Sequence, residues 1–245
     1  MDILNYKEET LVLDEGVNDP GIFKAIILAG GPGSGKTYVA KKLGLKTLGL
    51  RVVNSDQFFE MLLKRKGLSL KMPESEYDAR EVARWSAKAL TDKRLKMTVA
   101  ARLGIIVDST SGDQTKTQRI ITMLKNSGYD VKVIFIETTL EVAKVRNKRR
   151  SRTLPDAVVE FSWKAANKVR PILKRIAGAK DYHEIDNNKE GLPNISGLAG
   201  TLTAWASRLN GAALEWTLAV KKGQDSMKSE DINNSIMKTF KEYRV

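Results

Sequence analysis

The chain of 245 residues contains no cysteine and a single histidine, His183. The lack of cysteine excludes a disulfide framework, a thiolate metal site and a cysteine nucleophile, and it suits a reducing cytoplasm. One histidine does not make a His-rich metal site, and it argues against a Ser-His-Asp triad. In the segment DYHEID, we expect His183 to be a strand residue rather than a catalytic one.

The sequence also lacks a clear export or membrane segment. The first ten residues, MDILNYKEET, are acidic and lack the apolar core of a signal peptide. The most apolar stretch, residues 196–220, is interrupted centrally by charged and polar residues, so it fits a membrane span poorly. We therefore expect a cytoplasmic protein with no membrane partner.

Acidic residues are scarce relative to basic ones, 29 against 42, which gives a formal net charge of +13. The excess is concentrated in residues 144–180, where twelve Lys and Arg residues face only Asp156 and Glu160. A concentrated positive surface favours phosphate-rich partners, nucleic acid or nucleotides, over neutral metabolites. The alternative interpretation is a solvated basic helix face.

The hydrophobic pattern predicts alternating strands and helices. Short apolar runs predict strands at 24–29, 50–56, 103–110, 129–138 and 181–188. Helical patterns lie between them, at 37–45, 57–66, 73–103, 114–126, 139–150 and 155–177. Alternation of this kind predicts an α/β fold with a doubly wound, mostly parallel five-stranded sheet.

We divide the chain into an α/β domain, residues 1–191, and a helical C-terminal extension, residues 192–245. In the extension, apolar residues recur at helical spacing: Leu198, Leu202, Trp205 and Leu209. We expect this helix face to pack on the core or on a second copy of the chain, which would make the protein a homo-oligomer.

Residues Gly30 to Thr37, GGPGSGKT, fit the P-loop pattern G-x-x-x-x-G-K-[ST] between an expected strand and an expected helix. Its glycines let the backbone turn tightly and aim N–H groups at phosphate oxygens. Lys36 is expected to reach the β- and γ-phosphates, and the Thr37 hydroxyl to bind Mg²⁺. The predicted ligands are ATP and Mg²⁺, and the predicted nucleotide-binding residues are Gly31, Gly33, Ser34, Gly35, Lys36 and Thr37.

Two carboxylates follow predicted strands. Asp108, after GIIV, occupies the position of a Walker B carboxylate that holds Mg²⁺, although an Asp there is also common as a cap. Asp56, in VVNSDQFF, lies where open α/β sheets bind ligands, and it suits a base for an acceptor hydroxyl. From spacing alone, a helix N-cap at Asp56 is an equal alternative.

The string RNKRRSRTLP carries three candidate catalytic arginines, Arg146, Arg150 and Arg152. Arg146 and Arg150 are four residues apart and share a helix face, and Pro155 ends the regular pattern. We expect an exposed, arginine-rich lid over about residues 146–155 that neutralises the transferring phosphoryl group and excludes water. The alternative is a solvated basic face.

Four segments together resemble the P-loop kinases grouped with zeta toxins and phage polynucleotide kinases. They are DPGIFKAIILAGGPGSGKT, RVVNSDQFF, GIIVDST and RNKRRSRTLPDAVV, within residues 19–160. The resemblance is closest to a phage-encoded, zeta-toxin-like branch, which implies the cytoplasm of a phage host as the location. It implies that Asp56 is the base and that Arg146, Arg150 and Arg152 form the phosphate-engaging lid.

The resemblance leaves the acceptor open. Zeta toxins phosphorylate a nucleotide-sugar, polynucleotide kinases a 5′-hydroxyl, and a related phage activity the hydroxymethyl group of a modified pyrimidine in DNA. The zeta-toxin sugar-binding pattern is not recognisable in residues 57–100. We therefore expect an ATP-dependent phosphotransferase acting on a nucleic acid hydroxyl, with DNA favoured. The alternatives are a zeta-like kinase of a small nucleotide or nucleotide-sugar, and a non-catalytic NTP-binding module.

Overall fold

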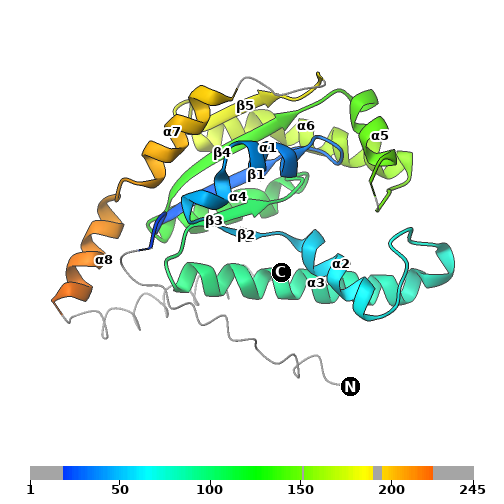
Figure 1. Cartoon of the computed structure of the whole chain (residues 1–245), viewed down its shortest axis with the longest axis horizontal. Helices are drawn as coiled ribbons and strands as arrows, with labels where there is room; N and C mark the ends of the chain where they lie inside the picture. Colours follow the sequence, from blue (N-terminus) through cyan, green and yellow to red (C-terminus); the bar gives the residue numbers. More distant parts are fainter. Residues whose placement is uncertain (1–18, 151, 190–194, 223–245) are drawn as a thin grey trace.

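A computed structural model describes residues 19–150, 152–189 and 195–222. Its centre is a five-stranded sheet whose strands are all parallel (Figure 1). The strands are β1 (Lys24–Ala29), β2 (Arg51–Val53), β3 (Ile105–Asp108), β4 (Asp130–Glu137) and β5 (Tyr182–Asp186), in the spatial order β2-β3-β1-β4-β5. The predicted α/β fold class is thereby confirmed.

The strand order places the P-loop at the middle of the sheet. β1 is central because it pairs with β3 on one side and β4 on the other. After β1 the chain crosses to β2 on one side, whereas after β3 it crosses back over β1 to β4. Such a reversal creates a crevice beyond the carboxyl ends of the strands, where ligands of open α/β sheets bind.

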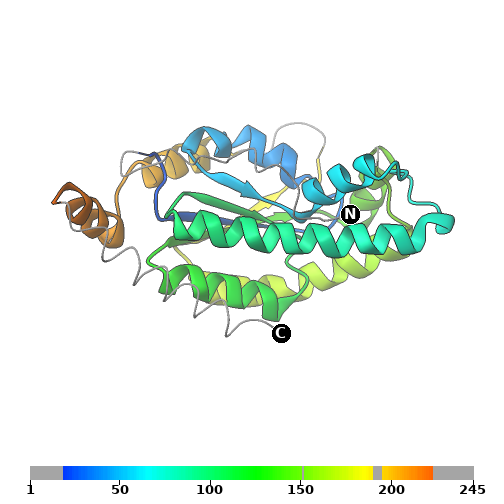
Figure 2. The same ribbon diagram turned by 90° about the horizontal axis from the view of Figure 1, so that it is seen from below.

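Helices cover both faces of the sheet, as Figure 2 shows. One face carries α1 (Lys36–Lys42), the short 3-10 helix η2 (Leu45–Leu48) and α7 (Ser196–Ala206) over a cluster built on Ile26, Leu28 and Ile134. The other face carries α3 (Tyr77–Ala100), α4 (Gln114–Asn126), α6 (Asp156–Ala177) and α8 (Gly211–Lys221) over a cluster built on Ala25, Ile27 and Val133. Alternate residues of each strand therefore enter opposite cores, as a two-sided sheet requires.

Helix α2 (Ser55–Arg65), the 3-10 turn η3 (Glu74–Glu76) and the first part of α3 form an arm beyond the carboxyl edge of the sheet (Figure 1). The arm has its own apolar cluster of Phe59, Leu63, Ala83 and Ala87. The predicted strand at 50–56 is shorter than expected because Asn54 caps α2: its side chain accepts a hydrogen bond from Asp56 N at 2.7 Å.

The C-terminal helices are anchored at the opposite, amino edge of the sheet. Trp205 of α7 donates its indole N–H to Asp130 Oδ2 at 2.6 Å and lies against the ammonium groups of Lys24 and Lys132. Trp216 of α8 contacts the ring of Phe23 edge to face. Residues 195–222 are therefore packed on the core; the domain boundary at 191 and oligomerisation through these helices stay predictions.

No described helix is both long enough and apolar enough to cross a membrane.

Candidate active site

The P-loop leaves β1 and turns through backbone conformations that favour glycine. Gly30, Gly33 and Gly35 have φ of 142°, 76° and 86°. Helix α1 then begins at Lys36, whose ammonium donates to the carbonyl oxygens of Gly30 at 2.7 Å and Gly31 at 3.3 Å. The loop thus forms a cradle at a helix N-terminus with its lysine folded across it, the geometry that binds phosphate groups.

The loop is held from outside by residues that sequence analysis did not single out for this role. Buried Asn187, just after β5, donates its amide to the Ser34 carbonyl at 2.8 Å. A Cβ on Gly33 would lie 2.3 Å from the carbonyl oxygen of Ala143 in α5 (Leu140–Lys148), so Gly33 is required for this approach. Neither contact leaves a local sequence signal, because each joins residues more than a hundred positions apart.

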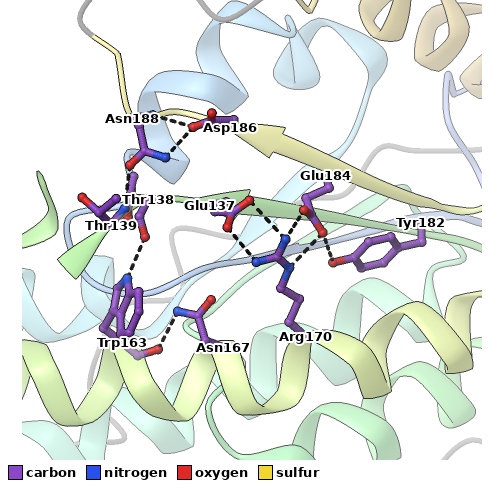
Figure 3. A network of polar contacts seen from close by, with 10 residues as sticks. All are labelled: Glu137, Thr138, Thr139, Trp163, Asn167, Arg170, Tyr182, Glu184, Asp186 and Asn188. Atoms are coloured by element: carbon purple, nitrogen blue, oxygen red, sulfur yellow. Dashed lines mark hydrogen bonds and ion pairs between the residues drawn. The ribbon is translucent and has the colours of Figure 1, made fainter.

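Trp163 of α6 lies behind the same loop. A Cβ on Gly31 would meet the Trp163 Cα at 3.2 Å, and the indole N–H donates to the Thr138 carbonyl at 2.8 Å (Figure 3). The sequence alone makes Trp163, on a predicted helix, a candidate core or interface anchor, or a residue that stacks on a base. Its indole in fact joins α6 to the end of β4 behind the P-loop, so the helix that follows the arginine string is tied to the nucleotide side.

Arg170, two turns further along α6, joins the end of β4 to the middle of β5 (Figure 3). Its guanidinium donates to both carboxylate oxygens of Glu137, at 2.7 and 3.1 Å, and also binds Glu184. Tyr182 completes the network by donating to Glu184 at 3.0 Å. At least one of the twelve basic residues of 144–180 is therefore structural, because it ties α6 to β4 and β5.

Asp108 ends β3 beside the P-loop lysine. Its Oδ2 accepts a hydrogen bond from Asn54 Nδ2 at 2.7 Å, while its Oδ1 is buried without a hydrogen-bond partner. Burial raises the pKa of Asp108, although the charge of Lys36 and the Asn54 hydrogen bond oppose the rise. Burial likewise lowers the pKa of Lys36, opposed by the charges of Asp108 and Asp56. These charged groups thus lie close enough to affect one another.

Asp56 lies in the first turn of α2, on the arm. It is not the N-cap, because Asn54 has that role, so the cap alternative is wrong. Its carboxylate is about half exposed, and Oδ2 forms an ion pair with Arg152 Nη2 at 2.8 Å. Asp56 therefore places a partly solvated carboxylate just after the carboxyl end of β2, and its charge opposes the lowering of the Lys36 pKa by burial.

The three arginines have different surroundings. Arg146 of α5 donates to the Asn187 carbonyl at 2.7 Å, next to the P-loop. Arg150 is exposed, and its charge lowers the pKa values of both Lys36 and Asp108 as a smaller contribution. Arg152 is only 5% exposed: besides Asp56 it binds Glu60 at 3.2 Å and covers the ring of Phe59.

The expectation that Arg152 lies on an exposed lid is therefore wrong. The predicted break between helices is present, since α5 ends at Lys148 and α6 begins at Asp156. The connection does not stand free in solvent, because Arg152 finds two carboxylates and an aromatic ring on the arm. A buried cation is held where it is paired and hydrogen-bonded, and sequence spacing did not reveal that partner helix.

The residues present fit a nucleoside triphosphate with Mg²⁺. The glycine cradle and Lys36 suit the phosphates, and the unpartnered Asp108 Oδ1 suits a cation. No cluster of three or more carboxylate or histidine ligands occurs among the described residues. Mg²⁺ characteristically needs only one or two protein oxygens besides phosphate oxygens and water, so Thr37 and Asp108 would suffice as its protein ligands.

The sheet order, the P-loop and the helical arm define a P-loop fold of the kinase type. An AAA domain family model matches residues 26–170, more than half of the chain. The chain therefore belongs to this AAA domain family. No curated protein matches it.

Solved structures with the same fold include the AvrRxo1-ORF1:-ORF2 complex, with a TM-score of 0.55 and 20% identity over 74% of this chain. The same complex with ATP matches with a TM-score of 0.54 and 19% identity over 77% of this chain. This chain spans only 63% and 65% of the matched AvrRxo1 chains. A proposed kinase from Chloroflexus aurantiacus matches over 97% of its own length and 74% of this chain, at 16% identity and a TM-score of 0.54.

At these identities the similarity establishes the fold, and the acceptor must be inferred from the site itself. The phage origin implied by the sequence resemblance stays a prediction.

Proposed function

We propose that this protein is an ATP-dependent phosphotransferase that moves the γ-phosphate to a hydroxyl group of a nucleic acid. The acceptor would be a 5′-hydroxyl or the hydroxymethyl group of a modified pyrimidine, with DNA favoured. The observation that carries the proposal is the placement of Asp56: a carboxylate on a separate arm, in the first turn of α2, that pairs at 2.8 Å with Arg152 from the connection between α5 and α6. A loop that only held nucleotide would have no need of such a carboxylate.

The chemistry assigns one task to each group. The P-loop amides, Lys36 and Thr37 would hold the triphosphate, with Asp108 holding Mg²⁺, which supplies charge neutralisation at the phosphates. Asp56 would accept the proton of the acceptor hydroxyl as its oxygen bonds to the γ-phosphorus and the bond to the ADP oxygen breaks. Arg150 and Arg146 would neutralise charge on the transferring group.

The outer face of α6 supports a polymeric acceptor. Phe161, Lys164, Lys168 and Arg175 all lie on the solvent side of this helix, and Phe161 is 76% exposed. Exposed lysines and an exposed aromatic ring are the two elements with which proteins bind single-stranded nucleic acid, through phosphate contacts and base stacking. A nucleotide-sugar would not extend along this helix, which is why the small-molecule kinase is the second candidate rather than the first.

The test is transfer of labelled γ-phosphate to a panel of acceptors: 5′-hydroxyl DNA and RNA, hydroxymethyl-pyrimidine DNA, nucleosides and nucleotide-sugars. We expect labelled DNA product from the parent protein and none from Lys36→Ala, which lacks the principal phosphate cation. Label on nucleosides or nucleotide-sugars alone would favour the zeta-like alternative. Nucleotide binding without transfer to any acceptor would leave the non-catalytic NTP-binding module.

A further inference from the structure

We infer that Asn147 is a positioning residue: its buried amide fastens the arginine-bearing connection between α5 and α6 so that Arg150 faces the nucleotide and Arg152 faces the acceptor. The inference rests on the proposed function, and it assigns a role to a residue outside the phosphate-binding and carboxylate groups of the site. Asn147 is the last-but-one residue of α5 and is 1% exposed.

The amide of Asn147 binds both backbone groups of one residue. Its Nδ2 donates to the Leu154 carbonyl at 2.7 Å, and its Oδ1 accepts from the Leu154 N–H at 3.1 Å. The asparagine side chain offers a donor and an acceptor on one short planar group. It can therefore pair with both the N–H and the carbonyl of one residue, as a neighbouring β-strand would. This pair of bonds closes the chain between Asn147 and Leu154, directly before Pro155 and the start of α6.

The same helix face touches the P-loop one turn earlier. Ala143, four residues before Asn147, lies against Gly33 so closely that a Cβ on the glycine would be 2.3 Å from its carbonyl oxygen. Residues four apart share a helix face. Asn147 therefore ties the connection to the side of α5 that is already fixed against the phosphate cradle.

The closed connection carries two arginines with different surroundings, the exposed Arg150 and the buried Arg152. Arg150 lies near enough to Lys36 and Asp108 to affect both electrostatically. Arg152 reaches the arm and binds Asp56 at 2.8 Å and Glu60 at 3.2 Å. A fixed arginine pair of this kind keeps charge complementarity in place before reaction and helps to exclude water from the transferring phosphate.

Loosening the connection should therefore change how the phosphate is divided between water and the intended hydroxyl, and not only the rate of transfer. In Asn147→Ala, water should compete better with the intended hydroxyl, because Arg152 no longer holds Asp56 and Arg150 no longer shields the phosphate. We expect the ratio of ATP hydrolysis to acceptor phosphorylation to rise about tenfold, less than the roughly 10²-fold that a 1 Å misplacement of reacting groups can cost. The KM for the acceptor should rise more than the KM for ATP.

The chain offers a matched control in Asn210. Its amide also makes two backbone bonds, donating to the Gly128 carbonyl at 2.8 Å and accepting from Ala213 N at 2.8 Å, but it lies at the other edge of the sheet. Asn210→Ala should lower the melting temperature without moving the hydrolysis-to-transfer ratio. An Asn147→Ala protein that keeps the parent's ratio would overturn the inference.

Limited trypsin digestion tests the fastening without any acceptor. Cleavage after Arg149 and Arg150 should be faster in Asn147→Ala than in the parent and in Asn210→Ala, with Asn147→Asp intermediate because it keeps the acceptor oxygen but loses the donor. Equal cleavage rates would refute the role of Asn147. A parent protein that transfers phosphate to no acceptor would refute the proposed function, while the digestion would still decide whether Asn147 holds this segment.

Discussion

Asp56 is the residue on which the proposed chemistry depends. Asp56→Asn should lower turnover by about 10²-fold or more, the usual scale for loss of a general base. Affinity for ATP should change little, because Asp56 lies on the arm rather than on the P-loop. Steady-state transfer assays and nucleotide titrations measure the two effects separately.

The matched control for that variant is Glu60→Gln. Glu60 is the other carboxylate partner of Arg152, at 3.2 Å, so its loss disturbs the same arginine without removing the base. Most of the turnover should survive in Glu60→Gln. Equal losses in the two variants would mean that Asp56 acts only by holding Arg152.

Asp108 gives a prediction about pH. Because burial raises its pKa, the folded state binds this proton more tightly than the unfolded state, and stability falls as pH rises from the ordinary carboxyl value of 3.8 through the raised value. Asp108→Asn removes that penalty. The variant should therefore melt at a higher temperature than the parent near neutral pH, and the difference should vanish below the ordinary value.

Thermal unfolding across this range, without nucleotide or metal, measures the effect. Asp92→Asn, at an exposed carboxylate of α3, is the control that should show no such trend. A difference between Asp108→Asn and the parent that did not change with pH would contradict the assignment. The same variant should lose transfer activity, since a carboxamide binds Mg²⁺ poorly.

Arg152 and Arg150 should respond differently to truncation. Arg152 is buried and binds two carboxylates, so Arg152→Ala should cost about 1.5–3 kcal/mol of stability, the range for hydrogen bonds to charged groups. Arg150 is exposed, and Arg150→Ala should stay within about 0.5 kcal/mol of the parent. Denaturant unfolding measures both, and an Arg152→Ala protein as stable as the parent would show that its ion pairs contribute little.

At the scale of single residues, the sequence identifies the residues that belong to a local motif. It does not identify the residues whose role depends on contacts in the folded structure. The P-loop lysine and Asp108 could be found because motif and strand end are local patterns. Asn187 and Asn147 could not, because a single asparagine has no signal until its distant or loop-closing partner is known. The burial of Arg152 was missed for the same reason: its carboxylates belong to α2, about a hundred positions away.

At the scale of elements, α6 carries the test of a polymeric acceptor. Changing Lys164 and Lys168 together to Ala should weaken binding of long single strands and flatten the log–log salt dependence by about 0.7 per lost phosphate contact. Turnover of a single-nucleotide acceptor should hardly change. Hydrogen bonds from Lys164 and Lys144 lower the pKa of Glu160 to about 2, so Glu160 stays ionised and part of the charge of Lys164 is offset.

The matched control is a double change of Lys41 and Lys42, two lysines at the end of α1 on the opposite face of the sheet. It removes the same charge and should leave the salt dependence of binding nearly as in the parent. Equal effects from the two double variants would mean that net charge alone drives binding. Affinity that does not depend on the length of the nucleic acid would contradict the polynucleotide acceptor.

The elements themselves were largely predictable, because buried parallel strands are continuous apolar runs and the helices between them are periodic. The helix at Gln114–Asn126 begins and ends where the pattern predicts. The predicted strand at 50–56 is longer than the observed Arg51–Val53, since the polar residues after Val53 belong to a capped helix. The spatial order of strands does not follow from local pattern and required the structure.

For the whole molecule, the candidate site and the C-terminal anchor lie at opposite edges of the sheet, so stability and activity should be separable. Trp216→Leu removes the edge-to-face contact with Phe23 and should cost about 2–3 kcal/mol, below the range for full truncation of a buried aromatic because Trp216 is only partly buried. The kcat at a temperature well below the melting point should match the parent. A parallel loss of kcat would mean that the two edges are coupled.

The separate apolar cluster of the α2–α3 arm has an evolutionary consequence. Phe59, Leu63, Ala83 and Ala87 pack with one another and belong to neither of the two clusters that cover the sheet. Mutations in this cluster therefore disturb packing mainly within the arm, and the phosphate cradle keeps its support from β4, α5 and α6. Under the proposed function, a lineage that carries this scaffold can exchange one acceptor for another through changes in the arm alone, while the P-loop is inherited unchanged.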